Sequence, residues 1–169
     1  MMTNQTIDVP QLPSVESSSF QKHPKRFLNK KLIAKTLLFI PLLATVVVPF
    51  FAVEEEPWIW KVALVLWLVL LLLTIFMAYK EYFVRGYVLR EHDITYRKGW
   101  LFHHQTTVPF NRIQHTEINH GPIDRMFTLC ELEIFTAGGS SSDLSISGLD
   151  PVDAQKLKEY ISSKTSTYA

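Results

Sequence analysis

Hydrophobic and polar positions are distributed very unevenly along this chain, with two long apolar runs in its first half. Residues 36–53 and 62–79 contain 18 positions each and no charged side chain. A helix rises about 1.5 Å per residue, so each run covers roughly 27 Å, close to the hydrocarbon thickness of a bilayer. With flanking residues included, the pattern predicts a hairpin of two transmembrane helices at about 32–53 and 58–79.

A pair of buried core helices is the alternative interpretation of these runs. Only about ninety residues follow them, too few to cover two helices that are apolar on every face. A cleavable signal peptide is also disfavoured, because the first run begins well inside the chain and the second follows almost at once. We expect the chain to stay anchored in the membrane through both helices.

Cationic residues gather at the two ends of the predicted hairpin that lie away from its connection. Residues 22–35 contain six Lys or Arg and residues 80–90 contain three, whereas Lys61 is the one cation near the connection, which carries the acidic run at 54–56. By the positive-inside rule, both termini are cytoplasmic and the acidic connection faces outward. This pattern predicts a multi-pass protein of the cytoplasmic membrane.

Composition divides the chain into three segments. Residues 1–21 are polar, show neither helical nor strand periodicity, and are interpreted as a disordered cytoplasmic tail. Residues 22–79 hold a basic juxtamembrane strip and the two helices, and residues 80–169 form a cytoplasmic domain. The basic strip either attracts anionic lipid head groups or serves only as a topology signal.

Alternation of apolar and polar residues after position 80 predicts a β-rich domain. Strands are expected at residues 82–90, 94–97, 101–108, 112–119, 130–136 and 143–147. Asp150 is a good N-cap for a final amphipathic helix, whose apolar stripe contains Leu157, Tyr160 and Ile161. The expected fold is a membrane-anchored α+β protein, with a small β-barrel or sandwich capped by this C-terminal α-helix.

The segment "RKGWLFHH" at residues 97–104 is the most suggestive exposed stretch. It places Arg97, Lys98 and Trp100 at a predicted hairpin tip, where two cations and a tryptophan are typical of a surface that touches lipid head groups. In the alternative interpretation, Trp100 packs on the β-domain. These three residues form the candidate lipid or anion surface.

A second candidate group contains Arg112, Asp124 and Arg125. The last two flank a Gly-Pro turn, and together with Arg112 they are candidates to hold an anionic ligand. Alternatively, Asp124 and Arg125 hydrogen-bond the loop backbone and fix its shape. The sequence leaves both interpretations open.

The sequence contains no motif of a known catalytic or metal site. A phosphate-binding glycine loop, a nucleophile elbow and a zinc-binding helix are all missing. Adjacent histidines at 103 and 104 point to opposite faces of a strand, and Cys130 is expected to be a small buried residue. Residues 80–169 contain ten basic and eleven acidic residues, which does not favour nucleic-acid binding. We therefore expect neither an enzyme, a metal, a cofactor nor a nucleic-acid partner.

The segment "VPFNRIQHTEINHGPIDRMFTLCELEIFTAGGSSSDLSISGL" at residues 108–149 carries a family resemblance. Residues 121–129 contain a Gly-Pro-hydrophobic-Asp-Arg turn followed by Phe and Leu, and residues 136–138 end a strand with Thr-Ala-Gly. Together with the two helices, this resembles the bacterial pleckstrin-homology-like (bPH2), membrane-flanked family of YdbS-like proteins. Thr128 and Cys130 replace other small residues of the family pattern.

The resemblance implies a PH-like domain on a helical hairpin in a bacterial cytoplasmic membrane, and it implies no reaction. Members of the family often accompany larger membrane proteins that carry several copies of the domain. The first hypothesis is therefore a noncatalytic adaptor that binds such a partner, and recognition of lipid or a small anion is the alternative. The link at residues 90–93 opposes Arg90 with two acids, which disfavours the strong inositol-phosphate binding of eukaryotic PH domains.

Overall fold

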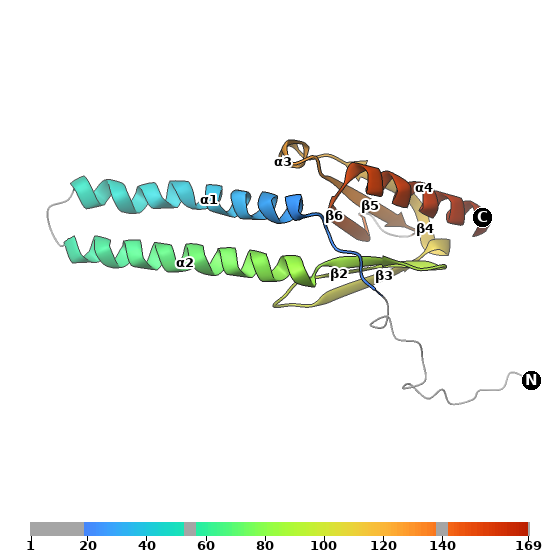
Figure 1. The fold of residues 1–169 in the computed structure, drawn as a ribbon, viewed down its shortest axis with the longest axis horizontal. Helices are drawn as coiled ribbons and strands as arrows, with labels where there is room; N and C mark the ends of the chain where they lie inside the picture. Colours follow the sequence, from blue (N-terminus) through green and yellow to red (C-terminus); the bar gives the residue numbers. More distant parts are fainter. Residues whose placement is uncertain (1–18, 53–56, 138–141, 169) are drawn as a thin grey trace, which may run out of the picture.

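The computed structural model describes residues 19–52, 57–137 and 142–168 (Figure 1). Most of the predicted tail, the acidic connection at 53–56 and the glycine turn at 138–141 lie outside the described residues. Two long helices lie side by side at one end of the molecule, and a β-rich domain forms the other end.

The helical hairpin consists of α1 (Lys25–Ala52) and α2 (Pro57–Val84). Both helices are long and apolar enough to cross a membrane, and their apolar windows are 6% buried within the protein. The indole Nε1 of Trp67 donates a hydrogen bond to the carbonyl oxygen of Phe39 at 3.2 Å, and the two aromatic rings meet edge to face. The predicted pair of apolar helices is therefore confirmed.

Both helices extend beyond the predicted spans into charged sequence. α1 begins at Lys25, ahead of the expected start near residue 32, and α2 continues to Val84, past the expected end near residue 79. The strand prediction that began at residue 82 is therefore wrong at its start. Arg85 donates to Glu81 at the end of this helix, an i,i+4 pair that favours the additional turn.

The β-rich domain is built from two separate three-stranded antiparallel sheets. The strands are β1 (Gly86–Leu89), β2 (Asp93–Lys98) and β3 (His104–Pro109) in the first sheet, and β4 (Ile113–Asn119), β5 (Cys130–Thr136) and β6 (Leu144–Leu149) in the second. Within the described residues no ladder joins the two sheets. Of the two predicted arrangements, the sandwich is therefore confirmed, and the closed barrel is wrong.

Apolar side chains from both sheets meet between them and form the core. The predicted alternation is visible in β5 and β6, where Leu132, Ile134 and Ile146 are fully buried, whereas in β2 the three consecutive residues 94–96 are buried. The C-terminal helix α4 (Pro151–Tyr168) covers β4, β5 and the short 3-10 helix η3 (Phe110–Arg112). Asp150 caps α4 as predicted, because its Oδ1 accepts from the N–H of Val152 at 3.1 Å.

The segment Gln21–Phe27 covers two sheet edges that would otherwise be open. Gln21 exchanges backbone hydrogen bonds of 2.8 and 3.1 Å with Tyr87 on the edge strand β1. His23 Nδ1 donates to the carbonyl oxygen of Gly148 at 3.3 Å, and the ring of Phe27 packs on the same residue of the edge strand β6. Unpaired edges are sites of unwanted strand addition, so this segment gives an open sandwich the protection that closure would give a barrel.

Candidate functional site

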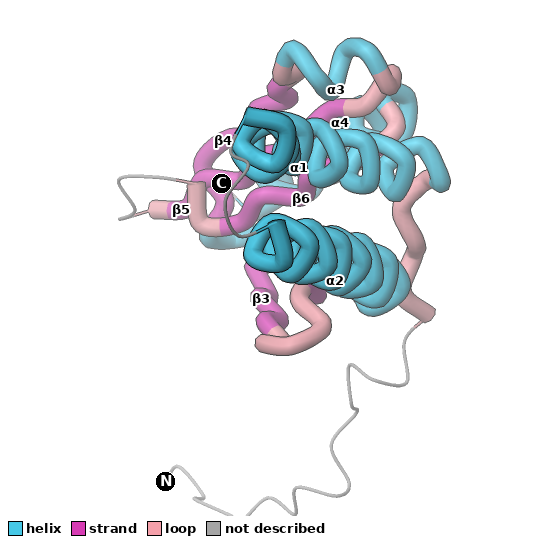
Figure 2. The backbone as a smooth tube through the Cα atoms, turned by 90° about the vertical axis from the view of Figure 1, so that its left-hand side faces the viewer, coloured by secondary structure: helices cyan, strands magenta, loops and turns pink. Residues whose placement is uncertain are grey.

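The candidate site is the junction where the helical hairpin meets the sandwich. Viewed along the helices, α1 lies on the side of α4, α2 lies on the side of β3, and β6 lies between the two helices (Figure 2). The ion pairs and hydrogen bonds of this junction come from the charged ends of both helices. The junction therefore lies where the membrane-spanning sequence gives way to the β-domain.

Arg85 is the central residue of the junction. Its Nε donates to Glu81 at 3.0 Å, and its Nη1 donates to the hydroxyls of Tyr96 at 3.0 Å and Ser147 at 3.2 Å. The guanidinium carries five donors in a fixed plane, so one side chain bonds α2, β2 and β6 together. Burial raises the pKa of Tyr96, so this phenol stays a neutral partner.

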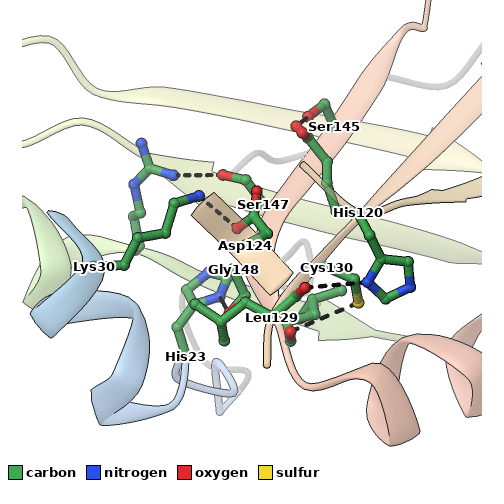
Figure 3. Close-up of polar contacts among 12 residues, drawn as sticks. His23, Lys30, His120, Asp124, Leu129, Cys130, Ser145, Ser147 and Gly148 are labelled. Carbon is green, nitrogen blue, oxygen red and sulfur yellow. Dashed lines mark hydrogen bonds and ion pairs between the residues drawn. The ribbon is translucent and has the colours of Figure 1, made fainter. Parts of the chain in front are cut away.

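The same junction binds α1 through ion pairs. Lys31 reaches the second carboxylate oxygen of Glu81 at 2.9 Å, so that carboxylate bridges a cation from each helix end. Lys30 pairs with Asp124 of α3 (Pro122–Met126), and these contacts lie close to Ser147 and Gly148 (Figure 3). The hairpin and the sandwich are thus held together by polar contacts as well as by packing.

His23 is the buried titratable residue of the junction. It is 3% exposed, and the carbonyl of Gly148 can only accept, so Nδ1 carries the proton. Nε2 is buried and has no partner among the described residues. Burial lowers the pKa of His23 to about 4, with Arg85 and Lys31 adding repulsion, so the ring is neutral at physiological pH.

Two clefts adjoin this polar junction, and Arg85 lines both of them. One is a space of about 500 Å³ between the end of α2 and the turn at residues 98–102, and it is lined by Met77, Lys98, Trp100 and Phe102. The other is a space of about 370 Å³ between α1 and Ser147 of β6, and it is lined by three lysines and Arg85. Each cleft combines cationic and apolar walls next to the membrane-spanning sequence.

The structure places Arg97, Lys98 and Trp100 in different surroundings. Arg97 donates from Nε to the carbonyl oxygen of Val84 at 3.2 Å and stacks over the ring of Phe20, so it supports the end of α2. Lys98 is exposed in the cleft beside α2. Trp100 contacts Phe76 of α2 edge to face, with ring centroids 6.0 Å apart. This hairpin tip lies against a membrane-spanning helix.

The group of Arg112, Asp124 and Arg125 is not brought together. Arg112 is exposed before β4, while Asp124 and Arg125 follow its other end, so a seven-residue strand separates them. Asp124 also accepts at its backbone oxygen from the N–H of Leu129 at 2.9 Å. Since its carboxylate pairs with Lys30, Asp124 connects a loop to α1 and Arg125 remains exposed.

The remaining chemistry predicted from single residues can be compared with the structure. Cys130 is buried as expected, and burial raises the pKa of its thiol to about 11, so it is a poor nucleophile. In the link at residues 90–93, Arg90 Nε pairs with Asp93 Oδ1 at 2.7 Å. One of the two acids that the sequence sets against Arg90 therefore forms an ion pair with it. No three His, Cys, Asp or Glu side chains of the described ranges gather as a metal site.

Sequence reasoning missed the roles of His23, Phe27 and Arg85, whose contacts with Gly148 and Ser147 join segments far apart in the chain. One signal pointed to them. Gly148 interrupts the alternation of β6, and an isolated glycine in a strand is typical of close backbone approach. Its φ of +81° and its contact with the Phe27 ring give the reason.

Comparison with known proteins gives two matches. The family model of the bacterial PH domain matches residues 37–165. The chain is 28% identical over 136 residues to the transmembrane protein YdbS of Bacillus subtilis strain 168, an alignment that covers 80% of this chain and 82% of the relative. No solved structure matches.

Proposed function

The chain belongs to the bacterial PH domain family, and on that basis we propose that it is a noncatalytic adaptor of the bacterial cytoplasmic membrane. In this proposal the two helices anchor the chain, both termini are cytoplasmic, and the sandwich binds a second membrane protein with related domains. The basic flanks of the hairpin support this orientation. The observation that carries the binding role is the uncovered edge of β3.

β3 is a terminal strand of its sheet and pairs only with β2. Within the described residues, no backbone hydrogen bond covers its outer edge, whereas Gln21 covers β1 and His23 bonds to β6. Residues 104–107 are exposed. An uncovered edge is the structure to which an extended segment of a partner adds as a further strand.

The position of β3 selects the kind of partner. The strand starts just after the turn that contacts Phe76, so its edge lies next to the membrane-spanning part of α2. The junction fixes the sandwich on the hairpin through Arg85 and Lys31, which keeps this edge close to the bilayer. A partner that reaches the edge is therefore best held in the same membrane.

Contact of the hairpin tip with lipid is the second candidate function. Leu101 is 62% exposed and Phe102 is 72% exposed, and both follow Trp100 beside α2. Exposed apolar side chains next to a spanning helix are stable in the interfacial layer of a bilayer, where tryptophan is also favoured. This contact orients the β3 edge toward membrane partners, so the two functions are compatible.

Site-specific photo-crosslinking in native membranes tests both functions. A photoreactive residue at Gln105, on the β3 edge, is expected to yield one adduct with a membrane protein, and the same residue at Phe102 is expected to yield lipid adducts. Lys156, exposed on α4, is the matched control position and is expected to yield neither. Equal protein adducts from Gln105 and Lys156 would rule out a specific edge, and a lack of lipid adducts from Phe102 would rule out the lipid contact.

A further inference from the structure

The cleft between α1 and β6 has the composition of a binding site for an anionic lipid. It has a volume of about 370 Å³, within the range of small-molecule pockets. Its lining consists of Phe27, Lys30, Lys31, Ala34, Lys35, Leu38, Arg85 and Ser147. The side chains thus provide a strongly cationic part and an apolar part within one cleft.

Positive charge exceeds negative charge in this cleft. Four of its lining side chains are cations, and three of these pair with only two carboxylates, Asp124 for Lys30 and Glu81 for both Lys31 and Arg85. Lys35 is exposed and makes no ion pair within the described part of the chain. A concave surface with low-dielectric walls and excess charge of one sign concentrates ions of the other sign.

The cations and the apolar wall of the cleft follow each other along α1. Lys35 precedes the uncharged run that starts at residue 36, and Leu38, one turn further on, is 61% exposed. A lysine at this position reaches the head-group layer while the next turn lies in hydrocarbon. The same order, a charged head followed by an acyl chain, is the order of groups in a phospholipid.

We infer that this cleft binds one anionic phospholipid, with the phosphate between Lys31, Lys35 and the Ser147 hydroxyl and an acyl chain along Ala34 and Leu38. The site is separate from the proposed partner surface, since α2 lies between α1 and β3 (Figure 2). It also differs from the sequence-based candidate, because Lys98 and Trp100 line the cleft beside α2 and Arg97 supports the end of α2. Because Lys31 and Arg85 also hold the junction, a bound lipid would touch the residues that orient the sandwich.

Lipid retention by the purified full-length protein tests this inference. The protein in detergent is incubated with phosphatidylglycerol or phosphatidylcholine, and native mass spectrometry counts the lipids retained. One phosphatidylglycerol is expected to stay bound in preference to phosphatidylcholine. Lys35→Gln is expected to weaken its retention by about fivefold, the effect of one interfacial cation, while Lys35→Arg retains it.

Lys80 supplies the matched control. It is an exposed lysine near the C-terminal end of α2 and lies outside the cleft. Its ammonium lies 5.4 Å from the Phe76 ring centroid. Lys80→Gln is expected to leave retention unchanged. Equal losses from Lys35→Gln and Lys80→Gln, or equal retention of the two lipids, would overturn the site. Displacement of the lipid by millimolar inorganic phosphate would also overturn it, because the cleft would then bind a free anion.

Discussion

Replacing Gly148 with alanine is expected to push the Phe27 ring out of its position and to loosen the helical hairpin from the sandwich. Gly148 has a φ of +81°, and a β-carbon built on it would overlap the ring of Phe27. A side chain at positive φ costs about 1–2 kcal/mol, and overpacking a tight contact costs about 1–3 kcal/mol more. The free energy of unfolding in detergent should therefore fall by about 2–5 kcal/mol, measured as a shift of the denaturant midpoint.

A double-mutant cycle separates the two causes of this loss. In a Phe27→Ala background the ring is gone, so Gly148→Ala should cost only the backbone strain of about 1–2 kcal/mol. Phe27 is 2% exposed, so Phe27→Ala alone is expected to cost about 3–5 kcal/mol. An equal cost of Gly148→Ala in both backgrounds would show that the Phe27 contact does not hold the junction.

Lowering the pH from 6.5 to 4 is expected to destabilise the protein through His23. The folded-state pKa of His23 is about 4, below its ordinary value of 6.5. In this window the unfolded chain binds a proton that the folded chain does not bind, so stability is complete above pH 6.5 and falls as the pH falls. The shift corresponds to a loss of about 3 kcal/mol by pH 4, since one pKa unit is about 1.4 kcal/mol.

A His23→Gln variant isolates this effect from the carboxylates that titrate in the same range. The variant keeps a polar donor for the carbonyl of Gly148 but does not titrate, so its stability should fall less between pH 6.5 and 4. His103→Gln is the control, because His103 is exposed and should leave the wild-type pH dependence unchanged. Identical pH profiles for wild type and His23→Gln would show that His23 is not buried as a neutral ring.

The helices were predictable in number and position because lipid imposes a requirement on composition. An uncharged run of sufficient length marks where a chain can cross hydrocarbon, and both runs lie within α1 and α2. The ends of the helices were not predictable from the same signal. Hydropathy indicates where contact with lipid ends. The backbone hydrogen bonds of the helices continue beyond these points, through residues 25–31 of α1 and residues 80–84 of α2.

The strands β5 and β6 followed the period-two pattern, whereas three consecutive residues of β2 are buried. The bounds of β5, residues 130–136, agree with the prediction. Whether the two sheets close into a barrel depends on contacts between distant segments, which leave no periodic trace. Gln21 pairs with Tyr87, and His23 bonds to Gly148, so the edges of β1 and β6 are covered by sequence that was assigned to the tail and the basic strip.

The positive charge of the candidate site was predictable from the sequence, but the residues that form the site were not. The sequence identifies the basic strip at residues 22–35, but it interprets these lysines only as a topology signal or a lipid-facing patch. The structure divides them, because Lys30 and Lys31 pair with acids of the junction while Lys35 remains unpaired among the described residues. Arg97 was interpreted as a surface cation, but its bond to the carbonyl of Val84 makes it part of the support of α2.

We propose that two helices cross the membrane and that the sandwich lies on the cytoplasmic side. Cysteine labelling in cells with a membrane-impermeant maleimide tests it most directly, because native Cys130 is buried and its thiol has a raised pKa. Glu55→Cys, between the two helices, should be labelled on intact cells. Glu91→Cys, at a side chain that is 78% exposed on the sandwich, should be labelled only after the membrane is disrupted. Labelling of residue 91 on intact cells would contradict the account.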